Sequence, residues 1–279
     1  MLNKSVSKLW KILPYIVVII GIIYVIVPFL WIISTSFKPK GDIFSNPVVY
    51  IPKSPTVQNF IDAWTKEPLG RWYVNTIIVS VGSTAIAIFL SMLAGYGFSR
   101  FPIKGKGILL TSILFSYMFP ICLIILPYFV MMSALHLVNT YLGLIITYLS
   151  SSLPFAIWML KGFFDSIPPE MDQAAMIDGC NRVSAFFRII VPIAAPGISA
   201  ATLYSFLVAW NNYFISLIMI TKDNMLTLNV GLTKFIAETG VEWGPLNAVA
   251  LLTSLPIIVA FLFFEKYMVA GMSAGAVKG

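Results

Sequence analysis

Six long apolar segments alternate with short polar segments along the chain. They cover roughly residues 13–36, 74–98, 107–131, 141–163, 193–220 and 246–267. A helix needs about 20 predominantly apolar residues to cross the hydrocarbon core of a bilayer, and each segment reaches that length. The runs are continuous rather than alternating, which favours helices over the strands of a membrane barrel. The pattern predicts an all-α polytopic membrane protein with six transmembrane helices.

The composition supports this prediction and changes the interpretation of the net charge. Of the 279 residues, 59% are hydrophobic and only 10% are charged, whereas a soluble domain carries about a quarter charged residues. A net charge of +7 would suggest nucleic-acid binding in a soluble protein. Here the basic residues lie in short segments between apolar runs, so membrane topology accounts for them better.

The basic clusters also predict an orientation. Lys4, Lys8 and Lys11 precede the first apolar run, which is too long for a signal peptide and lacks a small-residue cleavage site. Further short basic clusters lie at 100–106 and 182–188. Short cytoplasmic segments carry the excess of Lys and Arg. We therefore expect a multi-pass protein of the plasma or inner membrane, with both termini in the cytoplasm.

Prolines interrupt most of the apolar segments, at Pro28, Pro120, Pro127, Pro154, Pro196 and Pro256. Each proline lacks a backbone N–H and kinks or interrupts its helix. In lipid, the carbonyls that this frees need a neighbouring helix or a water-filled cavity. Broken helices of this kind are frequent around translocation pathways.

The chain offers no energy source of its own. No carboxylate lies in the interior of an apolar segment, and Glu265 lies near the boundary of the last one. An ion-coupled transporter would carry its proton or ion on a carboxylate inside a span. The segment Lys104–Gly107 lacks the preceding glycine and the following Ser or Thr of a phosphate-binding loop. If the chain drives transport, the energy comes from another chain, and we expect no cofactor in this one. A passive channel or scaffold remains an alternative.

The residues for catalysis are sparse as well. His136 is the single histidine, and no cysteine lies near it in the sequence. Cys122 lies inside an apolar run and Cys180 in a polar stretch, so we expect two reduced thiols. An intramembrane enzyme would need a nucleophile–base pair or a metal-ligand set, and we therefore interpret the chain as non-catalytic.

The polar segment 167–192 is too polar to span a membrane. Pro168–Pro169 suits the start of a helix, and Glu170 and Asp172 complement the positive end of its dipole. Gly179 then suits a left-handed helix stop. The pattern predicts a short helix that ends in a tight glycine turn, between the fourth and fifth spans.

A second short helix is predicted after that turn. Asn181 is a suitable N-cap, and Pro192 leads into the fifth span. An apolar stripe with helical spacing follows the cap, at Val183, Phe186, Phe187 and Ile190. We expect the whole segment to lie along the cytoplasmic membrane surface, either as a generic interfacial linker or as a docking element.

The same segment resembles the coupling loop of ATP-binding-cassette (ABC) importer permeases. That pattern is Glu-Ala-Ala, three residues, Gly, nine residues, then Ile-x-Leu-Pro, and the match here is Gln173-Ala174-Ala175, Gly179 and Ile189–Pro192. Gln173 replaces the glutamate and Val191 replaces the leucine. With Gln173 we expect no salt bridge where the family's glutamate can make a charged contact, and only a neutral hydrogen bond is available there. The resemblance implies ATPase coupling by Glu170, Gln173, Ala174, Ala175, Asp178 and Gly179.

Nearly the whole chain resembles the maltose-transporter-type sugar permeases. The matching motifs, in order, are Ser36–Pro39, Asn75-Thr76, Tyr96–Arg100, Trp210–Tyr213, Thr227–Leu232 and Gly275–Gly279. The resemblance implies one transmembrane permease domain over 1–279, with a core of about 74–267, a cytoplasmic coupling loop at 167–192 and an extracytoplasmic loop at 221–243. It also implies a sugar or oligosaccharide importer, with glycerol phosphate or another small solute as the alternative cargo.

Partners follow from the same resemblance. It implies a second permease subunit, two ATPase subunits that carry ATP and Mg, and an extracytoplasmic sugar-binding protein that contacts the loop 221–243. It implies that the C-terminal tail reaches the ATPase pair through Gly275, Ala276, Val277, Lys278 and Gly279. Aromatic and amide groups that suit a sugar occur together at Trp210, Asn211, Asn212 and Tyr213. These four are the predicted substrate-pathway residues.

Overall fold

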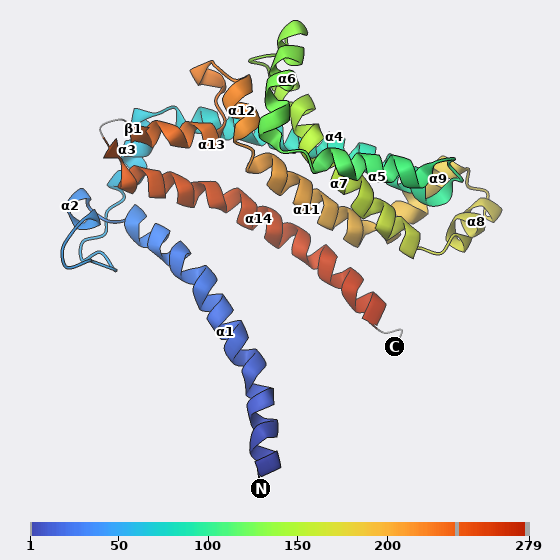
Figure 1. The fold of residues 1–279 in the computed structure, drawn as a ribbon, viewed down its shortest axis with the longest axis horizontal. Helices are drawn as coiled ribbons and strands as arrows, with labels where there is room; N and C mark the ends of the chain where they lie inside the picture. Colours follow the sequence, from blue (N-terminus) through green and yellow to red (C-terminus); the bar gives the residue numbers. More distant parts are fainter. Residues whose placement is uncertain (1, 238–239, 277–279) are drawn as a thin grey trace. The chain divides into compact units, whose positions relative to one another are not determined.

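The computed structural model describes residues 2–237 and 240–276 of the chain. The chain divides into two compact units, and Figure 1 traces its elements in order of sequence. One comprises Met1–Pro68 and Leu232–Ser254, and the other comprises Leu69–Gly231 and Leu255–Gly279. The last helix, α14 (Trp243–Ala276), contributes residues to both.

The first unit contains one long helix and several short elements. They are α1 (Leu2–Ser36), α2 (Lys40–Ile43), α3 (Gln58–Lys66), a 3₁₀ turn (Leu232–Phe235), β1 (Ile236–Ala237) and β2 (Gly240–Val241). The two strands pair antiparallel, with Ile236 opposite Val241. The α3 helix lies in a loop for which the Pro, Asn and Ser content would favour irregular structure.

A buried asparagine organises this unit. The Asn59 side-chain amide donates to the carbonyls of Ser36 and Lys38, at 2.9 and 2.8 Å. Gly244 lies so close that a Cβ there would be 2.3 Å from the Asn59 Oδ1. The first helix, the loop after it and the start of α14 therefore meet at one residue.

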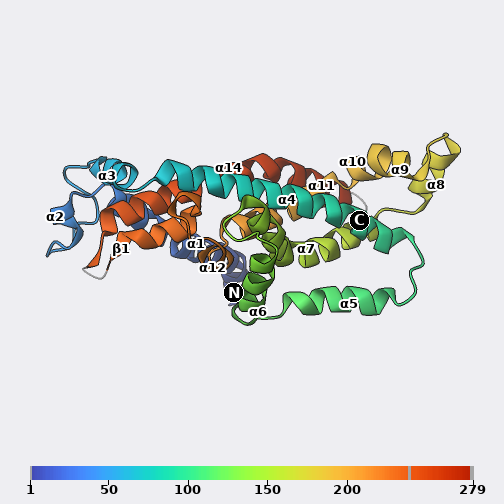
Figure 2. The ribbon, with the colours of Figure 1, turned by 90° about the horizontal axis from the view of Figure 1, so that it is seen from above.

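The second unit is built on three long helices that pack side by side, α4 (Leu69–Arg100), α7 (Tyr141–Ser166) and α11 (Ala195–Trp210) (Figures 1 and 2). Shorter elements complete it: α5 (Lys106–Tyr117), α6 (Ile121–Ala134), α8 (Glu170–Ile177), α9 (Arg182–Ala185), a π-helical turn (Phe186–Ile190), α10 (Val191–Ile193), α12 (Phe214–Met219), a 3₁₀ turn (Asp223–Met225) and α13 (Leu228–Gly231).

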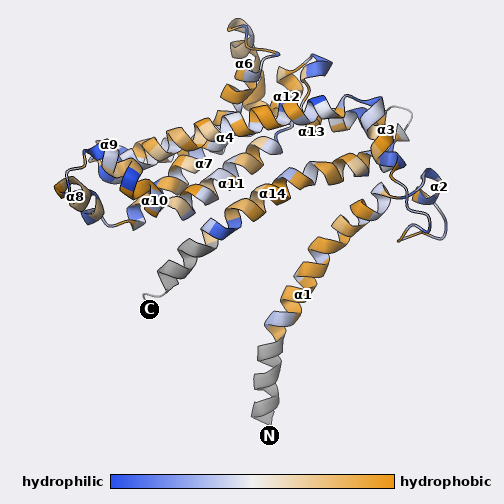
Figure 3. Cartoon of the chain, turned by 180° about the vertical axis from the view of Figure 1, so that it is seen from behind, coloured by the Kyte–Doolittle hydropathy of each residue, from blue (hydrophilic) through white to orange (hydrophobic). Residues whose placement is uncertain are grey.

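Hydrophobic residues predominate along the described parts of the long helices (Figure 3). Every residue from 13 to 31 in α1 is exposed within this chain. A continuous exposed apolar surface of that length would be unfavourable in water and suits hydrocarbon. Four helices among the described residues are long and apolar enough to cross a membrane, over Leu13–Ser36, Leu69–Arg100, Tyr141–Ser166 and Trp243–Met268.

Two further candidates are bent helix pairs, so the described part of the chain has four candidate spans, or up to six if each pair counts as one span. The α5 and α6 helices meet at 94°, and the helix over Arg182–Ile193 meets α11 at 79°. The span expected over 107–131 is thus a bent helix pair, and the interruption expected at Pro120 is confirmed. Pro120, which is the N-cap of α6, has no N–H to carry the helix onward.

The expected fifth span, 193–220, is also interrupted. The α11 helix ends at Trp210, and α12 begins only at Phe214. Asn211 is the C-cap of α11. The side-chain oxygen of Asn212 accepts a hydrogen bond from the Ile215 N–H at the start of α12. By contrast, Pro28, Pro127, Pro154 and Pro256 remain inside their helices.

Close packing of α4 on α7 depends on a small residue, which gives a testable expectation. A Cβ on Gly95 would lie 3.0 Å from the Lys161 backbone nitrogen and 3.2 Å from the Leu160 Cβ. We expect Gly95→Ala to lower the melting temperature in detergent, since overpacking costs about 1–3 kcal/mol. Gly97→Ala, whose Cβ meets nothing within 4 Å, should leave it unchanged or raise it. Equal melting temperatures would contradict this packing.

Candidate coupling segment and substrate pocket

The predicted helix and glycine turn are present. Pro169 is the N-cap residue of the α8 helix, which ends at Ile177 with Asp178 as its C-cap residue. Gly179 follows with φ +90°, and the next N–H, of Cys180, bonds back to the Ala175 carbonyl at 3.0 Å. A left-handed residue and a bond of this kind close the end of a helix, and glycine adopts that conformation without strain. The helix stop expected from the sequence is confirmed.

In the second half of the segment, the predicted N-cap at Asn181 is confirmed, but the predicted apolar stripe does not form one buried face. The Asn181 side chain accepts from the Ser184 N–H at 2.8 Å, as expected of an N-cap. Phe186 and Ile190 are buried, but Val183 is 67% exposed and Phe187 is 44% exposed. Phe186–Ile190 forms a π-helical turn. Its i→i+5 bonding changes the spacing, so the four apolar residues do not share one buried face.

Five of the six predicted coupling residues are exposed, and one is buried. Glu170, Gln173, Ala174, Asp178 and Gly179 are exposed. Ala175 is 5% exposed and packs inward. Apolar side chains accompany the exposed polar ones, and the most exposed of them is Ile177 at 85%. The free face of this segment is thus mixed polar and apolar, as docking surfaces between proteins are.

Asp172 anchors this segment to the helices beneath it. Its carboxylate accepts from the Tyr96 hydroxyl at 2.6 Å and from the Arg100 Nε at 2.7 Å. The Asp172 and Arg100 side chains are only 12% and 10% exposed. Two more guanidinium nitrogens of Arg100 donate to the carbonyls of Phe164 and Ile167, each at 2.9 Å. A buried, fully hydrogen-bonded ion pair therefore joins α8 to the ends of α4 and α7.

Aromatic rings pack around this anchor. The Tyr96 ring lies 4.5 Å from the Phe186 ring and 5.8 Å from the Phe164 ring, centroid to centroid. Phe186 and Phe164 belong to a buried cluster that also contains Leu160 and Ile190. Sequence reasoning assigned Asp172 only to the helix dipole. Tyr96 and Arg100 lie four positions apart on one helix face, but this spacing does not indicate that Asp172 is their partner.

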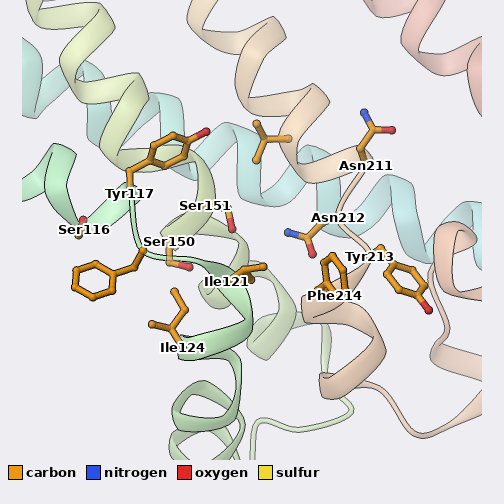
Figure 4. A pocket seen from close by; sticks show the side chains of 12 residues that line it. Ser116, Tyr117, Ile121, Ile124, Ser150, Ser151, Asn211, Asn212, Tyr213 and Phe214 are labelled. Carbon is orange, nitrogen blue, oxygen red and sulfur yellow. The ribbon is translucent and has the colours of Figure 1, made fainter.

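A second candidate site is a cavity of about 390 Å³ in the second unit (Figure 4). It lies at the break between α5 and α6, beside α7 and beside the break between α11 and α12. Twelve residues line it and none is charged. The polar members include Tyr117, Ser150, Ser151, Asn211, Asn212 and Tyr213.

Three of the four predicted substrate-pathway residues line this cavity, and the fourth does not. Asn211, Asn212 and Tyr213 line it. Trp210 does not, because it is 1% exposed, with its ring 5.5 Å from the Phe206 ring and 6.4 Å from the Tyr73 ring. The lining residues from α5 and α7 were missed. Serines and tyrosines scattered in apolar runs carry no sequence signal that they share a cavity.

Asn75 holds the predicted outer-loop segment, residues 221–231, to α4 and α7. This residue is fully buried. Its amide nitrogen donates to the carbonyls of Asn224 and Leu226, at 3.1 and 2.8 Å, and its oxygen accepts from the Tyr141 hydroxyl at 2.7 Å. Sequence reasoning noted Asn75 only as part of a motif and assigned it no contact.

Asn75 therefore gives a prediction for the loop. We expect Asn75→Ala to leave buried groups unpaired, at about 1–3 kcal/mol each, and to release the loop. Backbone hydrogen exchange over residues 224–231 should rise, as followed by mass spectrometry. The control is Asn247→Ala, because the Asn247 amide bonds only to a carbonyl of its own helix, that of Trp243. Unchanged exchange in Asn75→Ala would contradict the role of Asn75.

The predicted C-terminal contact falls partly outside the described residues. Gly275 and Ala276 are the last residues of α14. Val277, Lys278 and Gly279 lie outside the described range. The contact of this tail with ATPases stays a prediction.

These features define a class of protein: a multi-pass membrane protein with bent helices around an uncharged cavity and an anchored helix–turn segment. The chain belongs to the family of binding-protein-dependent transport system inner membrane components, whose model matches residues 87–272. It is an inner-membrane permease of the ABC importer class, a family of transport subunits rather than enzymes.

Individual relatives agree with the family. The sulfoquinovosyl glycerol transport system permease protein SmoH of Agrobacterium fabrum is 34% identical over 252 residues, which are 90% of this chain and 88% of that protein. The trehalose transport system permease protein SugB of Mycobacterium tuberculosis is 34% identical over 272 residues, 97% of each chain. Both relatives are transport system permease proteins, and each matches this chain over most of its length.

The fold also matches a solved structure. A crystal structure of a bacterial ABC transporter involved in the import of the acidic polysaccharide alginate is similar, with a TM-score of 0.80 at 21% sequence identity. The match covers 94% of this chain and 97% of that chain. It shows that the two chains share a fold.

Proposed function

We propose that this chain is one transmembrane permease subunit of an ATP-driven saccharide importer. It forms half of the translocation pathway as a single permease domain, with a core of about 74–267. It couples to ATPase subunits through α8 and the turn at Gly179. The observation that carries the proposal is the anchor at Asp172. An exposed helix end that is fixed to two membrane spans by a buried ion pair can transmit force from a partner.

The α4 helix connects α8 with the segment that Asn75 holds. Asn75 holds the outer-loop segment near one end of α4, and Tyr96 and Arg100 hold α8 near the other. Tyr96 follows Asn75 by 21 positions, which at 1.5 Å per residue is about 32 Å. That length matches a hydrocarbon core of about 30 Å. This length supports a cytoplasmic α8 and an extracytoplasmic segment at 221–231. Six spans, an extracytoplasmic loop that extends to residue 243 and cytoplasmic termini belong to the proposal.

The assembly proposed is a heterodimer of this chain with a second permease, two ATPase subunits and an extracytoplasmic sugar-binding protein. The family description supports the binding protein, and ATP and Mg are assigned to the ATPases. The exposed residues Glu170, Gln173, Ala174, Asp178 and Gly179 are assigned to the ATPase contact. Ala175 supports that contact from inside the segment. The substrate pathway is assigned to the cavity lined by Asn211, Asn212 and Tyr213.

Affinity purification of the tagged chain from mild-detergent extracts of native membranes tests this proposal. Mass spectrometry should identify a second permease and an ATPase in stoichiometric amounts. Recovery of the chain alone, under conditions that keep a known ABC importer intact, would favour a passive channel or scaffold.

A further inference from the structure

The cavity at the two helix breaks has the backbone geometry of a ligand site. Met118 and Pro120 separate α5 from α6, and Asn211–Tyr213 separates α11 from α12. Each break leaves backbone groups without partners inside a helix. At membrane depth, such irregular backbone is tolerated where it is buried in protein or lines a water-filled cavity. With a volume of about 390 Å³, the cavity falls in the range of about 300–1,000 Å³ typical of small-molecule pockets.

Its wall carries unused hydrogen-bonding groups. Within the described residues, the Ser151 hydroxyl and the Asn212 side-chain N–H groups bond to no other residue, and both residues line the cavity (Figure 4). The Asn211 amide nitrogen donates to the Leu207 carbonyl at 2.9 Å, which leaves its side-chain oxygen available. These groups supply a hydroxyl, an amide donor and an amide acceptor, which are the partners that sugar hydroxyls need.

Aromatic rings complete the wall. The Tyr117 hydroxyl accepts from the Tyr204 hydroxyl at 2.9 Å, and the Phe155 ring lies 4.6 Å from the Tyr204 ring. These contacts fix the Tyr117 ring at the edge of the cavity. Tyr213 lies in the opposite break. An apolar ring face beside polar groups suits a ligand that has both C–H faces and hydroxyls.

The absence of charge among the twelve lining residues sets the selectivity. A carboxylate, sulfate or phosphate placed here would lose its hydration without gaining a cationic partner, which is strongly unfavourable. A neutral ligand meets no such penalty. We propose that this cavity is a subsite on this chain for an uncharged saccharide of about disaccharide size, held by Ser151, Asn211 and Asn212 and excluding anionic solutes. This inference rests on the proposed function and narrows its cargo.

Ligand-observed saturation-transfer NMR tests the subsite directly. The complete complex is placed in nanodiscs without the binding protein, whose own selectivity would otherwise decide the result. The neutral probes are trehalose and N,N′-diacetylchitobiose, and the anionic probes are an alginate disaccharide and glycerol 3-phosphate. We expect transfer to at least one neutral probe and none to the anionic ones.

A matched pair of serine variants locates the binding. We expect Ser151→Ala to weaken the neutral probe about threefold to tenfold, the usual effect of one neutral hydrogen bond. Ser166→Ala, on the same helix and with its hydroxyl bonded to the Phe163 carbonyl, should change nothing. Anionic probes that bind as well as neutral ones, or an unchanged affinity in Ser151→Ala, would overturn the subsite.

An uptake measurement on the same preparation distinguishes a failure of the proposed subsite from a failure of the proposed importer function. With the binding protein and ATP restored, uptake of any saccharide upholds the importer function, even if the subsite test fails. Complete absence of ATP-dependent uptake in the wild-type complex would reject the importer function itself.

Discussion

Gly179→Trp is expected to abolish ATP-driven uptake and to weaken ATPase association by about 100-fold, or roughly 2.8 kcal/mol. Gly179 has φ +90°, and a Cβ built on it meets no atom of this chain within 4 Å. A large side chain would therefore project from the turn onto the face where an ATPase would dock. Within this chain the cost is limited to the left-handed conformation, about 1–2 kcal/mol for an ordinary residue. Co-purification of the ATPase and uptake in vesicles measure the effect.

Gly179→Asn separates the turn from the docking surface. Asparagine tolerates the left-handed conformation better than other side chains and is small. This variant should keep most ATPase association and uptake. Equal loss in both variants would trace the effect to the backbone of the turn. Normal association and uptake in Gly179→Trp would contradict the coupling role of this segment.

Asp172→Ala is expected to detach α8 from the spans beneath it. The substitution leaves the Arg100 guanidinium buried without its carboxylate, and breaking a buried pair in this way costs about 3–5 kcal/mol. Hydrogen exchange over residues 170–180 should rise while exchange in the middle of α4 stays low. ATP hydrolysis by the assembled complex should no longer respond to the loaded binding protein.

Two further variants isolate the ion pair. Asp178→Asn removes a carboxylate from the same segment, but Asp178 is exposed, so exchange should match that of the wild type. Combining Asp172→Ala with Arg100→Leu removes both charges. It should restore part of the protection, because no buried charge is then unpaired. If Asp172→Ala leaves exchange at 170–180 unchanged, the anchor is not what fixes α8.

Local rules account for what the sequence predicted well. Gly179 ends α8 and Asn181 caps α9, because each depends only on the conformation and hydrogen bonds of residues a few positions away. Apolar length likewise located the long helices α4 and α7. Such features can be read from a short window of residues.

The missed features depend on contacts between distant residues. Arg100 and Asp172 are 72 positions apart, and no pattern in either segment indicates that they form a pair. An average of hydrophobicity along a window also cannot show that the expected fifth span is open at Asn211–Tyr213. The apolar stripe was predicted from α-helical spacing. The π-helical turn at Phe186–Ile190 has a different spacing, so the predicted residues do not lie on one face.

Uptake of a radiolabelled saccharide into proteoliposomes tests the central claim most directly. The vesicles hold this chain with its second permease and ATPases, ATP is enclosed on the ATPase side, and the binding protein is added on the other. Our account predicts accumulation that requires both ATP and the binding protein and that Gly179→Trp abolishes. Equal uptake with and without ATP, or with Gly179→Trp, would contradict an importer driven through the α8 turn.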